Sequence, residues 1–191
     1  MKKLASTLPN MLLSLTLIAA VAAALLAFVY QTTEPVIATS KVATLKAGID
    51  KVVPEYDNVP FEEELLVDDY KIYPARKGGE LVGYAVESFT NNGFSGFVKV
   101  LVGIDKEGNI IDYTVLQQAE TPGLGSKMEE WFRGEKGSVL GMNLTAPLQV
   151  TKDGGKVNAI SAATISSRAF LETLNGAYAV VQKAIADGQL K

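Results

Sequence analysis

The sequence contains no cysteine and no histidine. Without these side chains the chain cannot form a Ser-His or Cys-His catalytic pair, a thiolate or imidazole zinc site, or a Cys-ligated iron–sulfur cluster, and it cannot bind haem through either residue. If the chain carries electrons, an organic cofactor must therefore hold them. The lack of cysteine also excludes disulfides, so cysteine usage gives no indication of the compartment.

The sequence also lacks a strong charge of either sign. It has 18 Lys and Arg against 21 Asp and Glu, a net charge of −3, and no long basic run. This balance argues against nucleic acid as a partner. A length of 191 residues is enough for one membrane anchor and one domain with a proper core.

One long apolar run is present, from Met11 to Tyr30. Twenty residues at about 1.5 Å each span roughly 30 Å, the thickness of the hydrocarbon core of a bilayer. The run predicts a retained transmembrane helix. A cleaved signal peptide is the alternative, because Ala22–Ala24 resembles a processing site, although its apolar core is normally about 7–15 residues. Lys2 and Lys3 predict a cytoplasmic amino terminus, and a single crossing is expected because no second apolar run follows.

The segment after the run predicts a stalk and a surface connection. Glu34-Pro35 is expected to open a helix, and Pro54 and Pro60 are typical of a connection. We expect an anchor at residues 1–30, a stalk helix and connection at 31–60, and a domain at 61–191. One side of the stalk helix is expected to carry its apolar residues, Val36, Ile37, Val42, Leu45 and Ile49.

The domain sequence predicts strands joined by short turns. Segments 70–73 and 81–88 flank a hairpin signal at Gly78-Gly79, and segments 98–104 and 110–117 flank another turn. The connections are too short for helical crossovers, so the sheet should be mostly antiparallel. The fold class is α+β, with helices packed on the sheet.

A helical pattern ends the chain, with Phe170, Leu174, Ala177, Tyr178, Val181 and Ile185 on one face. Small and hydroxyl residues of the stretch 158–167 lie where this helix should begin. Such a helix start is suited to an anion, because its backbone N–H groups are free. Ser161 or Thr164 could instead simply cap the helix. The pattern alone does not decide between an anion site and a simple helix cap.

A second stretch, Glu-Thr-Pro-Gly-Leu-Gly at 120–125, follows the last strand. Pro-Gly here suggests a type II turn, and glycines permit the close approach of a ligand. An ordinary turn is the alternative. A short helix is expected at 127–132, with Trp131 in the core.

The two stretches, 120–125 and Ser-Ala-Ala-Thr-Ile-Ser at 161–166, together closely resemble the FMN-binding domain family. The family includes the G subunit of the Rnf ferredoxin:NAD oxidoreductase and the C subunit of the sodium-translocating NADH:quinone reductase. The likeness runs from about Gly93 to Ser167. The size of the chain favours the Rnf type, with the quinone-reductase subunit as the alternative.

The resemblance implies covalent FMN. A separate flavin transferase is expected to esterify the Thr164 hydroxyl to the phosphate of FMN. The other residues expected at the cofactor are Glu120, Thr121, Gly123 and Leu124 in the first motif, and Ser161, Ala162, Ala163, Ile165 and Ser166 in the second. Three positions depart from the family pattern: Ala162 replaces a common Gly, Asn158 a common Asp, and Gln118 a frequent His.

The resemblance further implies an electron-transfer subunit of a membrane-bound, ion-translocating oxidoreductase complex. Its partners would be other membrane subunits and iron–sulfur subunits. The expected location is the bacterial cytoplasmic (inner) membrane, with the domain on the periplasmic side. Two other classes are open: a membrane-tethered flavin-binding or sensing module without redox turnover, and a hydrolase with Thr164 or Ser161 as nucleophile, for which a Lys would have to serve as the base.

Overall fold

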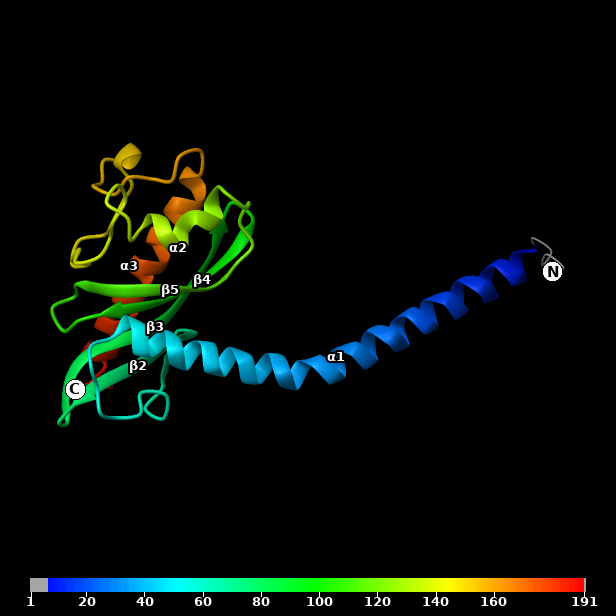
Figure 1. The fold of residues 1–191 in the computed structure, drawn as a ribbon, viewed down its shortest axis with the longest axis horizontal. Helices are drawn as coiled ribbons and strands as arrows, with labels where there is room; N and C mark the ends of the chain where they lie inside the picture. Colours follow the sequence, from blue (N-terminus) through cyan, green and yellow to red (C-terminus); the bar gives the residue numbers. More distant parts are fainter. Residues whose placement is uncertain (1–6, 191) are drawn as a thin grey trace. The chain divides into compact units, whose positions relative to one another are not determined.

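The computed structural model describes residues 7–190. Lys2 and Lys3, from which a cytoplasmic amino terminus is predicted, lie outside the described residues. The chain divides into two compact units, residues 1–43 and 44–191 (Figure 1). The elements in chain order are α1 (Leu8–Val52), β1 (Leu65–Val67), β2 (Tyr70–Lys77), β3 (Glu80–Gly93), β4 (Gly96–Ile104), β5 (Ile110–Gln118), α2 (Met128–Trp131) and α3 (Thr164–Ala186), with short 3₁₀ turns at η1 (Gly125–Lys127) and η2 (Thr151–Asp153).

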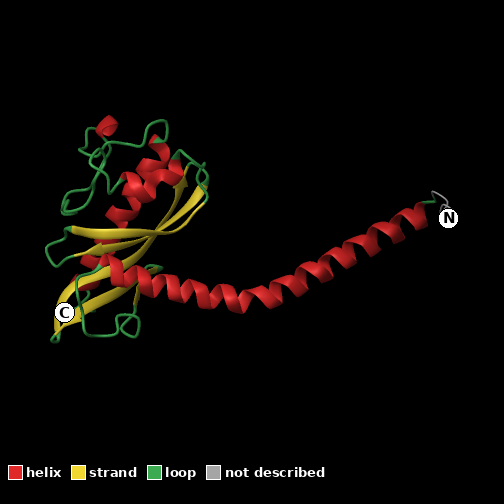
Figure 2. Cartoon of the chain, viewed as in Figure 1, coloured by secondary structure: helices red, strands yellow, loops and turns green. Residues whose placement is uncertain are grey.

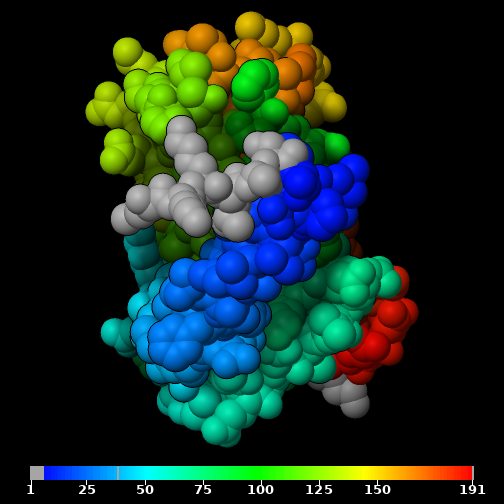
Figure 3. Space-filling view, turned by 90° about the vertical axis from the view of Figure 1, so that its right-hand side faces the viewer, coloured from blue at the N-terminus to red at the C-terminus, as the bar shows by residue number. Residues whose placement is uncertain are grey.

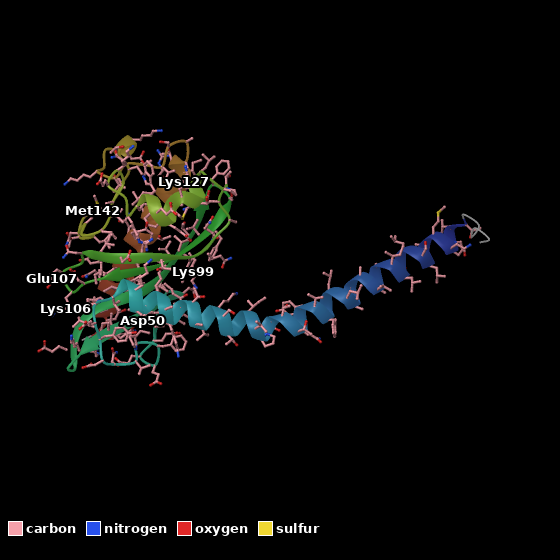
Figure 4. All side chains as sticks on the ribbon, in the orientation of Figure 1. Asp50, Lys99, Lys106, Glu107, Lys127 and Met142 are labelled. Carbon is pink, nitrogen blue, oxygen red and sulfur yellow. The ribbon has the colours of Figure 1, made fainter. Side chains whose placement is uncertain are left out.

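The first unit is the long amino-terminal part of α1. Its large apolar side chains, from Leu8 to Tyr30, are exposed on all sides of the helix (Figure 4). A helix that is apolar all round needs an apolar surrounding. In the described residues α1 alone is long and apolar enough to cross a membrane, judged by length and composition.

The expected separate stalk helix is not found, because α1 continues through Glu34 and Pro35 without a break. Pro35 cannot donate the backbone hydrogen bond that the Gln31 carbonyl would normally accept. The hydroxyl of Thr39 donates to the Pro35 carbonyl at 2.8 Å. Of the expected apolar face, Leu45 is half-buried and Ile49 is buried, whereas Val36, Ile37 and Val42 are exposed because they belong to the first unit.

The strands of the second unit lie side by side in a sheet (Figure 2). They form a five-stranded antiparallel meander in the order β1-β2-β3-β4-β5. The turn between β2 and β3 contains Gly78 and Gly79, both at positive φ, as the sequence predicts. This arrangement confirms the α+β class and the antiparallel sheet.

α3 packs on one face of the sheet, mainly over β3 and β4. Every second residue of β4 is buried on this face: Val98, Val100, Val102 and Ile104. Their alternation with Lys99, Leu101 and Gly103 predicts a half-buried strand, which is wrong because Leu101 and Gly103 are buried too, under the end of α1. The predicted face of α3 is correct except at its end. There Ala184 is buried and Ile185 is 42% exposed, since the inward direction falls three residues after Val181 and not four.

The other face of the sheet is covered within the second unit by the end of α1, through Ile49, Val52 and Val53. Gly103 of β4 makes this possible. A Cβ there would lie 1.7 Å from the Val52 carbonyl oxygen, so any side chain would push the helix end away. Within the second unit, both faces of the sheet are therefore covered by helix.

Aromatic rings connect α2 to the sheet and to α3. Phe132 stacks on Phe170 with ring centroids 4.3 Å apart, and Tyr113 meets Phe170 edge-on at 4.8 Å. The Tyr113 hydroxyl donates to the Met128 carbonyl at 2.8 Å, and burial raises the pKa of this tyrosine. Trp131 packs partly buried against the same core, as expected. These contacts fix the segment that follows β5.

Candidate functional site

Three segments that are distant in the sequence meet at one end of the second unit. They are the turn between β3 and β4, the loop after β5, and the start of α3. In Figure 3 the bright green hairpin end lies beside the yellow-green and orange segments. The segments surround a cavity of about 290 Å³, lined by Phe94, Glu120, Thr121, Leu124, Gly125, Ala162, Ala163, Thr164, Ile165 and Ser166.

The loop after β5 begins with the predicted type II turn. The Leu124 N–H donates to the Thr121 carbonyl at 3.1 Å, and Gly123 has a φ of 77°. Gly125 follows at a point of close approach. A Cβ there would lie 2.5 Å from the Ser166 hydroxyl oxygen and 2.6 Å from a carboxylate oxygen of Glu120. The loop can therefore lie directly against the start of α3.

Glu120 joins the three segments. Its side chain is buried, and its Oε2 atom accepts a hydrogen bond of 2.7 Å from the Ser166 hydroxyl. Its Oε1 atom accepts one of 3.3 Å from the backbone N–H of Ser95 in the hairpin. The side-chain oxygen of Gln118 accepts a bond of 2.7 Å from the Glu120 N–H. A single carboxyl group thus sets the geometry of the cavity.

The start of α3 has no side-chain cap. The N-cap residue is Ala163, and no side chain makes a capping hydrogen bond to the backbone there, so the capping interpretation of Ser161 and Thr164 was wrong. The first bond to the helix start is donated by the Ser167 N–H to the Ala163 carbonyl at 3.0 Å. The N–H groups of the residues before it, Thr164, Ile165 and Ser166, have no partner among the described residues. They are available to an anion at the cavity.

Lys152 supplies a positive charge at the same place. Its ammonium group donates to the Thr164 hydroxyl oxygen at 3.2 Å. The neighbouring Asp153 makes two bonds of 2.7 Å to Arg168 of α3, which hold the η2 turn against the helix. These bonds to Arg168 also hold the pKa of Asp153 below its ordinary value. Because Arg168 neutralises Asp153, the charge of Lys152 remains available.

The residues predicted from the two motifs lie together around the cavity, except Gly123 and Ser161, which do not line it. Phe94, Gly125 and Lys152 were missed. A large apolar residue at a hairpin tip is a signal that could have indicated Phe94. The variant position Asn158 lies outside the cavity, where its side-chain amide donates to the Lys136 carbonyl at 2.7 Å.

The geometry does not favour hydrolysis. A lysine that serves as a general base needs an apolar, desolvated environment, whereas Lys152 is exposed to solvent. Ser161 is exposed and has no hydrogen bond from a basic side chain among the described residues.

Comparison with known proteins places the site in a family. Residues 93–179 match the model of the FMN-binding domain. The chain is 34% identical over 184 residues to the G subunit of the ion-translocating oxidoreductase complex of Yersinia pestis, covering 89% of this chain and 88% of the relative. It is 33% identical to the same protein of Photorhabdus laumondii (85% and 84%) and 30% identical to that of Vibrio vulnificus (85% and 83%). The chain belongs to this family of G subunits of ion-translocating oxidoreductase complexes.

The residues of this family member fit a flavin phosphate at the cavity. Free N–H groups and Lys152 suit a phosphate, as described above, and three apolar side chains suit the ring. Phe94, Leu124 and Ile165 are 67%, 39% and 48% exposed around the opening. A cavity of about 290 Å³ is at the lower end of the range for ligand sites. It can hold part of an FMN molecule and leave the rest accessible.

Proposed function

We propose that this chain is the flavin-carrying electron-transfer subunit of an Rnf-type, membrane-bound, ion-translocating oxidoreductase, with FMN attached through its phosphate to the Thr164 hydroxyl. One observation carries the proposal. Thr164 lies in the cavity at an uncapped helix start, with free N–H groups around it and the Lys152 ammonium 3.2 Å from its hydroxyl oxygen. A phosphodiester keeps one negative charge, and this surrounding stabilises it.

Other residues of the cavity would orient the cofactor. Leu124 and Ile165 offer apolar surface to the ring, while Ala162 and Ala163 are small enough to leave the backbone accessible. The buried carboxyl group of Glu120 lines the same cavity and places a polar group near the ring. Bound FMN would supply one- and two-electron redox chemistry, and the protein would set its position and potential. No cysteine or histidine is present to hold a metal redox centre instead.

Covalent attachment has a physical advantage in the proposed location. We infer that α1 anchors the chain in the cytoplasmic membrane of a bacterium and that the domain lies on the periplasmic side. A cofactor that dissociated there would be lost by dilution. The relatives are named as subunits of an ion-translocating oxidoreductase complex. We therefore propose other membrane and iron–sulfur subunits as partners, with a flavin transferase for maturation.

The experiment is co-expression of the full-length chain with a flavin transferase, followed by a denaturing gel. A fluorescent band at the mass of the chain is expected for the parent. Thr164→Val keeps the shape and removes the hydroxyl, so the band should be present by protein stain and dark in fluorescence. Thr151→Val is the matched control, because it makes the same substitution at an exposed residue that lies outside both motifs and does not line the cavity. Fluorescence that survives in Thr164→Val would contradict the assignment of Thr164.

A further inference from the structure

Phe94 is exposed at the mouth of the cavity, on the tip of the β3–β4 hairpin. Its side chain is 67% exposed and lines the cavity together with Leu124 and Ile165. Single exposed apolar residues are common on protein surfaces. Here, however, three exposed apolar side chains from three separate segments border one opening.

The tip that carries Phe94 is anchored. The Ser95 N–H donates to Oε1 of Glu120 at 3.3 Å. A Cβ on Gly93 would lie 2.4 Å from the Gly96 carbonyl oxygen and 2.5 Å from the same Glu120 oxygen, so the turn is packed directly on the buried carboxylate. Gly96 has a φ of 97°, which favours glycine. The backbone that carries Phe94 is therefore anchored by the residue that also holds Ser166 at the start of α3.

We propose that Phe94 covers one face of the isoalloxazine ring of the flavin carried on Thr164, and that it is a positioning residue for the cofactor. The inference rests on the proposed function. Flat aromatic systems prefer offset-stacked or edge-on contact, and such contact removes the exposed phenyl ring from water. The phenyl ring, unlike a phenol or an indole, has no group that is easily oxidised. It shields the flavin from solvent without exchanging electrons with it.

The chemistry of the phenyl ring suggests a sharp test in the full-length, flavin-loaded chain. Phe94→Trp places an indole where the phenyl ring lies. An excited flavin takes one electron from an indole in contact with it and returns it as the pair relaxes, so emission is lost without net reaction. We expect Phe94→Trp to lose most of the flavin fluorescence per flavin, with the visible absorbance retained. Leu66→Trp is the matched control, because Leu66 is 65% exposed on β1 and does not line the cavity.

A second variant measures the shielding itself. Phe94→Ala should raise the quenching of flavin fluorescence by iodide, and Leu66→Ala should leave it unchanged. Both Phe94 variants should melt as the parent does, since the side chain is exposed. Unchanged emission in Phe94→Trp, or unchanged iodide quenching in Phe94→Ala, would overturn the inference while the flavin remains on Thr164. A parent chain without covalent flavin would overturn the proposed function, and this inference with it.

Discussion

At the residue scale, Ala162 has an unusual backbone. Its φ is 60°, in the left-handed region that favours glycine. A side chain in this region costs roughly 1–2 kcal/mol. Replacing Ala162 by glycine would remove this cost. The greater flexibility of glycine in the unfolded state would offset roughly 0.4–1 kcal/mol of the gain in stability. The chain therefore retains local strain beside the proposed attachment residue.

We expect Ala162→Gly to stabilise the domain by about 0.5–1 kcal/mol, which corresponds to a rise in melting temperature of roughly 1–4 °C for a domain of this size. Circular dichroism of the full-length chain in detergent measures this change. Ala159→Gly in the same loop is the control and should not stabilise, because Ala159 is not at positive φ. An equal rise in both variants would show that the strain at Ala162 is not the cause.

Lys152 is a second residue with a specific prediction. If its ammonium group pairs with the phosphate on Thr164, Lys152→Met should slow flavinylation by a limiting amount of transferase. The reduction should be at most about fivefold, since an exposed charge pair contributes at most about 1 kcal/mol. Intact-mass measurement over time follows the reaction. Lys156→Met removes an exposed charge from the same loop and should react at the parent rate; a parent rate in Lys152→Met as well would remove Lys152 from the site.

At the element scale, α3 has two roles. Its first residues form part of the cavity, and its buried face holds the helix on the sheet. Phe170 is fully buried and contacts both Phe132 and Tyr113. Phe170→Ala should destabilise the domain by about 3–5 kcal/mol, because it creates a cavity at this junction. Ile185→Ala on the same helix should change stability by less than about 0.5 kcal/mol, since Ile185 is partly exposed. Thermal melting of the two variants tests the packing, and similar losses in both would contradict it.

Elements with strong local patterns were predictable from the sequence. The alternation in β4 indicates the strand, and the glycines of the β2–β3 turn indicate the hairpin. The burial of the second face of β4 was not predictable, because the end of α1 covers it through tertiary contacts. The Pro122-Gly123 turn also formed as predicted, since its geometry depends on those two residues alone. The prediction of a separate stalk helix was wrong, because α1 continues through Pro35. A proline is typical of the first turn of a helix, but whether it ends a long helix depends on the surrounding chain.

The site was only partly accessible to sequence reasoning. Its two motifs are local, so the residues of the loop and of the helix start could be named. Phe94 lines the cavity and Lys152 contacts Thr164, and both are placed by tertiary contacts: Phe94 through Glu120 and Lys152 through the Asp153–Arg168 pair. No spacing in the sequence encodes such contacts. The uncapped helix start was also not predictable, because Ser161 and Thr164 are both good capping residues.

At the scale of the whole molecule, the chain combines an apolar helix with a folded domain. We expect one membrane crossing, because the sequence has one long apolar run. The residues after about Gln31 should lie outside the cytoplasm, because Lys2 and Lys3 precede the run. Alkaline phosphatase fused to the carboxyl end should be active, since that enzyme folds only outside the cytoplasm. A fusion protein that is produced and stable but inactive would show that the orientation is the opposite one.

The central claim is that FMN is bound covalently to Thr164, and peptide mass measurement tests it most directly. Trypsin cleaves after Lys156 and Arg168, which releases residues 157–168 as one peptide with four hydroxyl residues: Ser161, Thr164, Ser166 and Ser167. After co-expression with a flavin transferase, this peptide should be heavier than its sequence mass by one FMN less one water. Fragmentation should place the added mass on Thr164. An unmodified peptide from a chain that was co-expressed with an active transferase would contradict the account, and so would the added mass on one of the three serines.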